Sequence, residues 1–433
     1  MNYFSLNHNS KDVGFLEAVQ KGLAPDRGLY FPQTLPQLSK EFFENIESLS
    51  NVEIAFEVIR PFVGEDIPEK KLQSIIASTL SFDFPIVPIT NKIASLELYH
   101  GPTLAFKDVG ARFMARSLAF ANSQKKKKDL TILVATSGDT GGAVADGFYG
   151  VKGIKVVILY PKGKVSAIQE KQLTTLGKNI TALEVDGVFD DCQYMVKSAF
   201  IDDEIKSEIQ LTSANSINIA RWLAQMFYYF IAYKNTPHKN KKLIMAVPSG
   251  NFGNLCAGIV AKHIGLPIDH FVAATNINDT VPEYLQTGTY LPKPSEATIS
   301  NAMDVGDPSN FIRIQKLFNN DFFKLKKVLS GYAFTDTETK NAIKKLYKDV
   351  GYIADPHGAV GYLGLKKFLD QANDDYSGIF LETAHPIKFA ETIESTLKIK
   401  LDVPLQVQET MNRAKVSIPI KNYKELKSFL LEN

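Results

Sequence analysis

A lysine that follows a Gly-Pro turn is the first residue of this chain whose setting suggests chemistry. Residues 100–110 read HGPTLAFKDVG, and Lys107 stands between the turn at Gly101-Pro102 and an apolar helical pattern that starts at Val109. Lys107 is therefore predicted near a helix N-terminus, where unpaired N–H groups and the helix dipole disfavour a cation. Partial burial there would lower its pKa, and a neutral amine is what Schiff-base chemistry needs. The alternative interpretation is a solvated surface lysine.

Two glycine-rich loops each follow a predicted strand and precede a predicted helix. Residues 136–142 read TSGDTGG, and residues 249–254 read SGNFGN. Glycines let the backbone approach an anion, and the helix that follows presents unpaired N–H groups to it. The second loop is neither a Walker A loop nor the dinucleotide fingerprint. A tight turn would explain either loop alone, but both loops together with Lys107 suggest a phosphorylated aldehyde cofactor and a second phosphate or carboxylate on the substrate.

Alternating strands and helices must position these groups. The predicted strands are residues 95–99, 130–135, 155–160, 181–185, 243–247, 271–275 and 379–382, and the predicted helices among them are 143–149, 166–176, 190–201, 217–233 and 255–264. Repeated βαβ order, with strands that lack polar alternation, predicts parallel sheets covered on both faces. The fold class is therefore α/β, with two layers that share a cleft.

Three parts of the chain differ in pattern. Residues 1–90 are predicted to form a mostly helical N-terminal segment, with turns at Gly22 and after Pro25. Residues 129–212 are predicted to form a small mobile α/β domain. Residues 91–128 together with 213–433 are predicted to form a large α/β domain that binds the cofactor.

Composition excludes several classes of protein. The chain has 433 residues, 45% hydrophobic and 22% charged, with 49 Lys+Arg against 47 Asp+Glu and a net charge of +2. This is ordinary for a soluble globular protein, and no basic field argues for a nucleic-acid partner. Cys192 and Cys256 lack metal-ligand spacing and are interpreted as small core residues, so no metal site and no disulfide framework are expected. We recognise no signal peptide or membrane-spanning run and expect a cytoplasmic enzyme without a membrane partner.

Several motifs together resemble the threonine synthase family, pyridoxal-phosphate enzymes of the tryptophan-synthase-β-like fold (fold type II). These motifs are 100–108, 136–141, 189–193, 215–225, 248–254, 303–310, 355–361 and 383–389. The resemblance runs from GLAPD at 22–26 to the segment around Thr383, and it favours the microbial and fungal type with a long N-terminal segment. It implies that O-phospho-L-homoserine and water are converted to L-threonine and phosphate.

The resemblance also implies roles for individual residues. Lys107 would carry the Schiff base with pyridoxal 5'-phosphate, and Thr383 would face the pyridine nitrogen. The cofactor phosphate would be bound by Gly250, Asn251, Phe252, Gly253 and Asn254. The substrate phosphate is expected to contact two sets of residues. One set is Ser137, Asp139 and Thr140 of the first loop. The other is Asn218 and Arg221, which share a predicted helix face, and the planar fork of the arginine suits phosphate oxygens.

Some questions stay open at this stage. A phospho-lyase that releases a keto acid, ammonia and phosphate is an alternative reaction, and a ligand-binding protein without activity is an alternative class. His100, His357 and His385 lie in the motifs and are expected to orient loops by hydrogen bonding. Three positions depart from the family pattern. The chain has Arg27 where glycine is common, and it has Ser249 and Gly358 where threonine is common. A monomer or a homodimer is expected.

Overall fold

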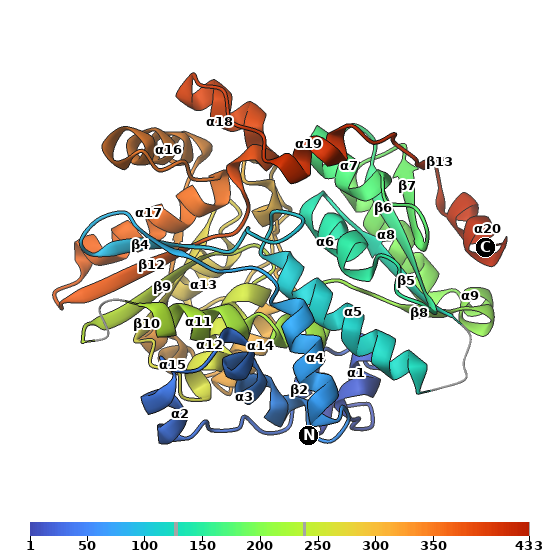
Figure 1. Ribbon diagram of the computed structural model, residues 1–433, viewed down its shortest axis with the longest axis horizontal. Coiled ribbons are helices and arrows are strands. Elements are labelled where there is room, and N and C mark those ends of the chain that lie inside the picture. Colours follow the sequence, from blue (N-terminus) through green and yellow to red (C-terminus); the bar gives the residue numbers. More distant parts are fainter. Residues whose placement is uncertain (125–128, 237–239, 433) are drawn as a thin grey trace.

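Two β-sheets covered by helices organise the chain in the computed structural model, which describes residues 1–124, 129–236 and 240–432 (Figure 1). The larger sheet has the strand order β11-β10-β9-β12-β4-β3, and the smaller one has the order β13-β7-β6-β5-β8. All strand pairs in both sheets are parallel except β3 with β4. The predicted α/β class with two parallel sheets is confirmed.

The strands of the larger sheet are β3 (Ile86–Pro88), β4 (Ile93–Glu97), β9 (Lys242–Pro248), β10 (His270–Thr275), β11 (Leu329–Ala333) and β12 (Tyr376–Glu382). The strands of the smaller sheet are β5 (Leu130–Ala135), β6 (Ile154–Pro161), β7 (Ile180–Val185), β8 (Gln210–Thr212) and β13 (Ile418–Ile420). Every residue of β5 is buried, as expected for a strand that has helices on both faces. We call the parts built around these sheets the large unit and the small unit.

The helices of the small unit are α6 (Asp139–Phe148), α7 (Ala167–Thr174), α8 (Phe189–Ile201), α9 (Asp203–Glu208) and α20 (Tyr423–Glu432). Those associated with the large unit are α5 (Lys107–Ser123), α10 (Ile219–Leu223), α11 (Met226–Asn235), α12 (Gly253–His263), α13 (Thr280–Thr287), η1 (Asn301–Met303), α14 (Phe311–Leu317), α15 (Phe322–Val328), α16 (Asp336–Val350), α17 (Pro356–Gln371), η2 (Pro386–Phe389) and α18 (Ala390–Leu397). Helix α19 (Leu405–Met411) lies where the C-terminal segment passes between the two units (Figure 1).

The N-terminal segment is mostly helical, as the sequence predicts, and it also contains a two-stranded antiparallel sheet. Its elements are β1 (Tyr3–Ser5), α1 (Phe15–Lys21), β2 (Tyr30–Pro32), α2 (Lys40–Asn45), α3 (Asn51–Val63) and α4 (Glu69–Thr79). Helix α3 begins at a capping box made by Ser50 and Glu53, and its apolar face joins the core of the large unit. The segment supports α5 from outside, because α1 and α4 both pack on that helix (Figure 1).

Two expectations about elements differ from the structure. The long helix predicted over residues 217–233 is divided into α10 and α11, because the Gln225 side-chain amide donates to the Arg221 carbonyl and the Gln225 N–H bonds back to Trp222 in a tight turn. The C-terminal residues do not all belong to the large unit. Strand β13 pairs with β7, and α20 packs on α8, so this segment extends the small sheet.

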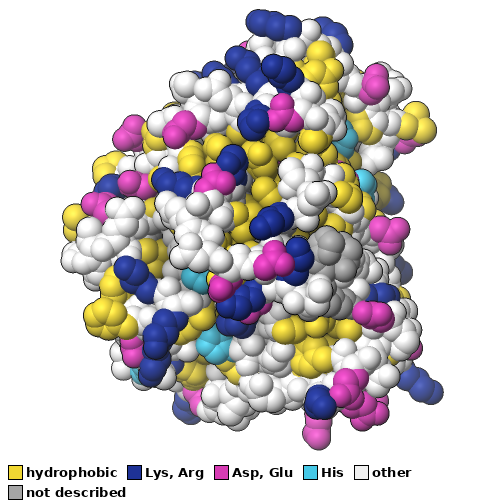
Figure 2. All heavy atoms as spheres, turned by 90° about the vertical axis from the view of Figure 1, so that its left-hand side faces the viewer, with side chains coloured by type: hydrophobic (Ala, Val, Ile, Leu, Met, Phe, Trp, Pro, Cys, Tyr) yellow, Lys and Arg dark blue, Asp and Glu magenta, His cyan; other side chains and the backbone are white. Residues whose placement is uncertain are grey.

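Charged side chains of both signs are scattered over the face in Figure 2, among hydrophobic and uncharged surface, and basic and acidic groups lie interspersed. This distribution matches the net charge of +2 and provides no single basic field on that face of the kind that follows a phosphate backbone. Within the described parts of the chain, no helix combines the length and apolarity that a membrane crossing needs.

Candidate active site

A cavity of 1190 Å³ lies between the two sheets at the carboxyl ends of their strands. In parallel α/β sheets this edge is where ligands bind, because the loops that follow several strands meet there. Eleven of the twelve residues predicted for the site line this cavity: Lys107, Ser137, Asp139, Thr140, Arg221, Gly250, Asn251, Phe252, Gly253, Asn254 and Thr383. Segments far apart in sequence thus converge on one space.

Lys107 is the first residue of α5, which is the helix start that the sequence predicts. Its side chain is 15% exposed, and its Nζ lies 3.9 Å from Asp139 Oδ2. Burial lowers the pKa of the Lys107 ammonium, and the nearby cations of Lys388 and Arg221 lower it further, while Asp139 and Asp355 act in the opposite direction. The result is a lysine that loses its proton more readily than a surface lysine, as nucleophilic attack on a carbonyl requires.

Asp139 is the first residue of α6 and is nearly buried. Its Oδ1 receives a hydrogen bond of 2.9 Å from Gln169 Nε2 and an ion pair of 2.7 Å from Lys388 Nζ. Burial by itself would raise the pKa of Asp139, but the ammonium of Lys388, and after it that of Lys107, hold this pKa well below its usual value. Asp139 therefore stays a carboxylate beside Lys107.

The loop that carries Ser137 and Thr140 is shaped by Thr136. The Thr136 hydroxyl accepts hydrogen bonds from the Gly138 N–H at 3.0 Å and from the Gly141 N–H at 2.8 Å. Gly138 has a φ of 138°, and a Cβ there would lie 2.4 Å from the Gln169 side chain, so glycine is required at this position. Ser137 and Thr140 of this loop thereby line the cavity at the start of α6, where a helix N-terminus can bind an anion.

The second loop fits a phosphate group. Phe252 is left-handed with a φ of 60°, and α12 begins at Gly253, so the first-turn amides of this helix lack intrahelical acceptors. A Cβ on Gly250 would lie 2.5 Å from the Ala302 carbonyl, which shows how closely the chain is packed behind the loop. Asn254 Nδ2 is buried and has no partner among the described residues, while its Oδ1 accepts hydrogen bonds from two tyrosine hydroxyls. A donor left in this way suits an anion bound in the cavity.

Arg221 offers a second anion contact. It is 2% exposed, and its Nη1 donates to the Ala214 carbonyl at 2.5 Å. Its Nε is buried without a partner in the described part of the chain. Burial lowers the pKa of the guanidinium to about 10, so it remains charged at neutral pH.

Asn218 is the one predicted site residue that the structure does not bring to the cavity. It is fully buried as the N-cap of α10, where its Oδ1 accepts from the Ala220 N–H at 3.0 Å. Its Nδ2 donates to the Val19 carbonyl at 2.9 Å. Both ends of the amide are therefore used to hold the N-terminal segment and the helix start. Residue 218 precedes the helix instead of lying on its face, so its side chain does not line the cavity as expected.

Several residues that line the cavity or support it were missed from the sequence. Asn215 and Ser216 line it just before α10, and Lys388 supports Asp139 from behind. All three lie within motifs identified in the sequence, which was the only available signal. For Lys388 the decisive fact is burial, and a sequence does not reveal burial next to a particular carboxylate.

The three histidines of the motifs have structural partners. His357 lines the cavity, with Nδ1 3.0 Å from Asp355 Oδ2 and Nε2 accepting from the Ala302 N–H. His385 accepts from the Ile387 N–H, and burial lowers its pKa to about 4, so it is neutral at physiological pH. His100 Nε2 lies 2.7 Å from Glu97 Oε2. These contacts orient the loops around Lys107.

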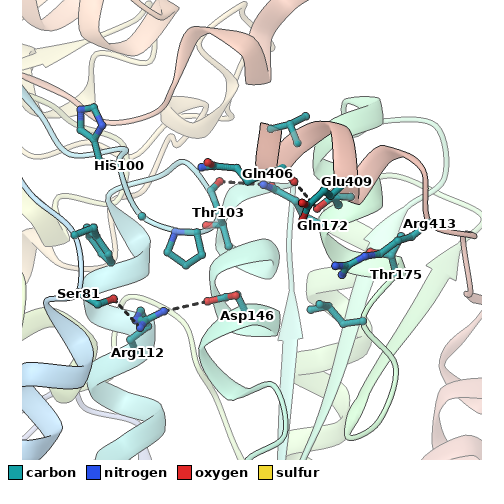
Figure 3. Close-up of a pocket in the computed structure, with 16 residues that line it drawn as sticks. Ser81, His100, Thr103, Arg112, Asp146, Gln172, Thr175, Gln406, Glu409 and Arg413 are labelled. Carbon is teal, nitrogen blue, oxygen red and sulfur yellow. Dashed lines mark hydrogen bonds and ion pairs between the residues drawn. The ribbon is translucent and has the colours of Figure 1, made fainter. Parts of the chain in front are cut away.

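A second cavity, of 450 Å³, is lined by residues 100–103, which precede Lys107 in the chain, and by residues of α5, α6, α7 and α19 (Figure 3). Helix α5 contributes Arg112, which pairs with Asp146 of α6 at 3.6 Å and so joins the two units. Gln172 of the small unit donates to the Thr103 carbonyl of the large unit at 3.1 Å (Figure 3). This cavity therefore marks the seam between the units.

Comparison with known proteins agrees with the geometry of the main cavity. A family described as pyridoxal-phosphate dependent enzyme matches residues 92–378, and families described as threonine synthase N terminus and threonine synthase, C-terminal, match residues 2–80 and 358–430. The threonine synthase of Escherichia coli is 45% identical over 410 residues, which cover 94% of each chain. The chain belongs to the threonine synthase family. The resemblance identified from the sequence motifs is thus confirmed.

Solved structures of threonine synthases extend this finding to three dimensions. The crystal structure from Escherichia coli superposes with a TM-score of 0.91 at 42% identity and covers both chains completely. A pyridoxal-phosphate-bound threonine synthase from Brucella melitensis superposes with a TM-score of 0.93 at 33% identity, over 100% of this chain and 99% of that one. The predicted fold, the enzyme class and the cofactor, pyridoxal phosphate, are confirmed for this threonine synthase family member.

Proposed function

We propose that this chain converts O-phospho-L-homoserine and water to L-threonine and phosphate. The observation that carries the proposal is the convergence of a largely buried lysine and two separate anion sites on one cavity. One anion site, at residues 250–254, suits the phosphate of the cofactor. The other, around Arg221 and the loop of Ser137 and Thr140, suits a phosphate that belongs to the substrate.

The chain's own groups divide the work of binding and proton transfer. When bound, pyridoxal phosphate supplies an electron sink for negative charge at the carbon next to the substrate amine. Lys107 Nζ would anchor its carbonyl carbon, and the Thr383 hydroxyl, which lines the same cavity, would face the ring nitrogen without enforcing its protonation. As a free amine, Lys107 Nζ takes the proton from substrate Cα and then from Cβ. Burial, which lowers the pKa of Lys107, favours the neutral amine that this role requires.

The substrate phosphate must be held before and during its departure. Arg221 supplies fixed positive charge, and Ser137 and Thr140 supply hydroxyl donors as the Cγ–O bond breaks. Arg221 belongs to the large unit, whereas Ser137 and Thr140 belong to the small unit. Closure of the two units on the phosphate therefore excludes bulk water from the reacting carbons. Cγ then gains a proton, the hydroxyl of one water is added at Cβ while the other proton of that water goes to the phosphate, and a proton returned to Cα completes threonine.

The deciding experiment is product analysis with the purified holoenzyme. We expect equal amounts of threonine and phosphate from O-phospho-L-homoserine, and no threonine from homoserine. Formation of 2-oxobutyrate, ammonia and phosphate in place of threonine would assign the chain as a phospho-lyase. Absence of phosphate release would refute both enzymatic assignments.

The cofactor lysine is tested separately from the reaction. Borohydride reduction of the holoenzyme followed by peptide mapping should label Lys107, and the Lys107→Ala variant should lose the cofactor absorbance. Label on another lysine would contradict the assignment.

The cell compartment and the assembly belong to the same proposal. Cys192 and Cys256 are both buried and free, which suits a reducing compartment, and we place the reaction in the cytoplasm. We propose a monomer or a homodimer in solution, which light scattering of the purified chain distinguishes.

A further inference from the structure

Lys388 is a fully buried lysine beside the main cavity. It lies in η2, just after β12, and its side chain has no exposed surface. Its Nζ forms an ion pair of 2.7 Å with Asp139 Oδ1 and donates to the Thr103 carbonyl at 2.7 Å. Lysines are almost never fully buried unless they are paired, because removal of an ammonium from water is costly. Lys388 does not line the cavity, so contact with a ligand does not explain its burial.

The balance of charge around Asp139 is unequal. One carboxylate faces two lysines: Lys388 at 2.7 Å, with a direct hydrogen bond, and Lys107 at 3.9 Å, without one. Coulomb attraction falls with distance, and the hydrogen bond adds to it at the shorter contact. Asp139 therefore holds the ammonium of Lys388 more tightly than that of Lys107.

Other charged groups near Lys107 do not reverse this order. Arg221 is a further cation and disfavours a proton on Lys107, as Lys388 does. Asp355 favours that proton, but its Oδ2 is engaged by His357 and its Oδ1 by the Gly358 N–H.

We propose that Lys388 is a positioning residue that acts as the permanent counter-ion of Asp139 and thereby leaves Lys107 free to be a neutral amine. The inference rests on the proposed function, in which Lys107 attacks the cofactor's carbonyl and then takes protons from the substrate. Without Lys388, Lys107 would be the one lysine left beside Asp139 among the described residues, and the carboxylate would favour its ammonium form.

The counter-ion contact also spans the two units. Asp139 belongs to the small unit, whereas Lys388 and Thr103 belong to the large unit. The Thr103 carbonyl accepts both from Lys388 and from Gln172 of the small unit, and the second of these bonds is visible in Figure 3. The charge arrangement that frees Lys107 is thus complete only when the units are together as in this structure.

The test measures the amine directly. Full-length chain stripped of cofactor is mixed with pyridoxal phosphate, and the rate of covalent capture at Lys107 is followed by absorbance from about pH 6 to about pH 10. Only the neutral amine attacks, so the rate at each pH reports the deprotonated fraction. In Lys388→Met we expect capture to be about tenfold slower near pH 7.5 and to regain the wild-type rate at high pH, since one pH unit corresponds to a tenfold change in that fraction.

Two controls make the result specific to charge. Lys388→Arg should behave as wild type, because it keeps the positive charge. Lys400→Met removes a lysine that is 89% exposed and pairs with Glu394, and it should also behave as wild type. A wild-type rate and pH profile in Lys388→Met would overturn the inference. An equal slowing at every pH would also overturn it, because that pattern means a misplaced amine rather than a protonated one.

A double variant covers the case in which Lys388→Met fails to fold. Lys388→Met with Asp139→Asn removes the buried pair together and leaves no unpaired charge. Lys107 then has no adjacent carboxylate at Asp139, so capture near pH 7.5 should be as fast as in the wild type. Slow capture in the double variant would refute a role that acts through Asp139. Covalent capture of pyridoxal phosphate by the Lys107→Ala variant would instead refute the assignment of Lys107 as the cofactor lysine, which belongs to the proposed function and not to this inference.

Discussion

Replacement of Arg221 by alanine tests the substrate phosphate site most directly. The guanidinium is buried at the cavity wall, keeps its charge, and has an Nε without a partner among the described residues. A phosphate oxygen placed there would complete its hydrogen bonding. The cofactor loop at residues 250–254 is separate from Arg221, so loss of the guanidinium should leave the cofactor spectrum unchanged.

The magnitude follows from the type of contact that is lost. A hydrogen bond to a charged group contributes about 1.5–3 kcal/mol. This corresponds to a fall in kcat/KM for O-phospho-L-homoserine of about 10- to 150-fold. The substitution also removes the donor to the Ala214 carbonyl, so some loss of thermal stability is expected in addition.

The assay combines steady-state kinetics with inhibition by inorganic phosphate. In Arg221→Ala, both kcat/KM and the affinity for inorganic phosphate should fall, while cofactor content stays at the wild-type level. Arg60→Ala is the control, because Arg60 is a half-exposed arginine paired with Glu57 and Glu69 outside the cavity. If Arg221→Ala left both the kinetics and phosphate inhibition unchanged, the substrate phosphate would have to bind elsewhere.

Three further predictions concern the wall around Thr383. Burial, and then the charge of Asp355, raise the pKa of Glu382 well above its usual 4.5. The folded protein therefore keeps a proton on Glu382 that the unfolded chain releases, and the free energy of unfolding falls as pH rises above about 4.5. Glu382→Gln should therefore gain thermal stability relative to wild type at about pH 8 but not at about pH 5, and a parallel pH dependence of the two melting curves would contradict this. Gly358→Ala should lose about 1–3 kcal/mol in denaturant unfolding, because its Cβ would overlap Glu382 Oε2; unchanged stability would show that the carboxyl moves freely. Thr383→Val should weaken binding of pyridoxal phosphate about 2- to 10-fold in a spectroscopic titration while the fold persists, and unchanged affinity would remove the hydroxyl from the cofactor site.

Local patterns in the sequence predicted the parts of the site that local chemistry determines. A lysine after a turn and before a helical pattern was placed correctly at the start of α5, and both glycine loops lie at helix starts on one cavity. These features depend on neighbouring residues, so spacing alone reveals them.

Features that depend on distant partners were not predicted. The helical pattern placed Asn218 with Arg221, but a bond to the Val19 carbonyl makes Asn218 a cap. The role inferred for Lys388 depends on its ion pair with Asp139, which is far away in sequence, so local patterns did not predict it. The departure at residue 358 is likewise explained only by the structure, since glycine there leaves room for the Glu382 carboxyl.

The pairing of β13 with β7 has a consequence for how the protein is made. Residues 183–185 leave the ribosome long before Ile418–Ile420 do, so the edge of β7 lacks its partner while most of the second half of the chain is being synthesised. An unpaired strand edge is a template for aggregation, and non-local pairings form slowly. Until its last strand arrives, the small sheet therefore exposes the edge of β7 in addition to that of β8, and the nascent chain carries an extra template for aggregation during synthesis.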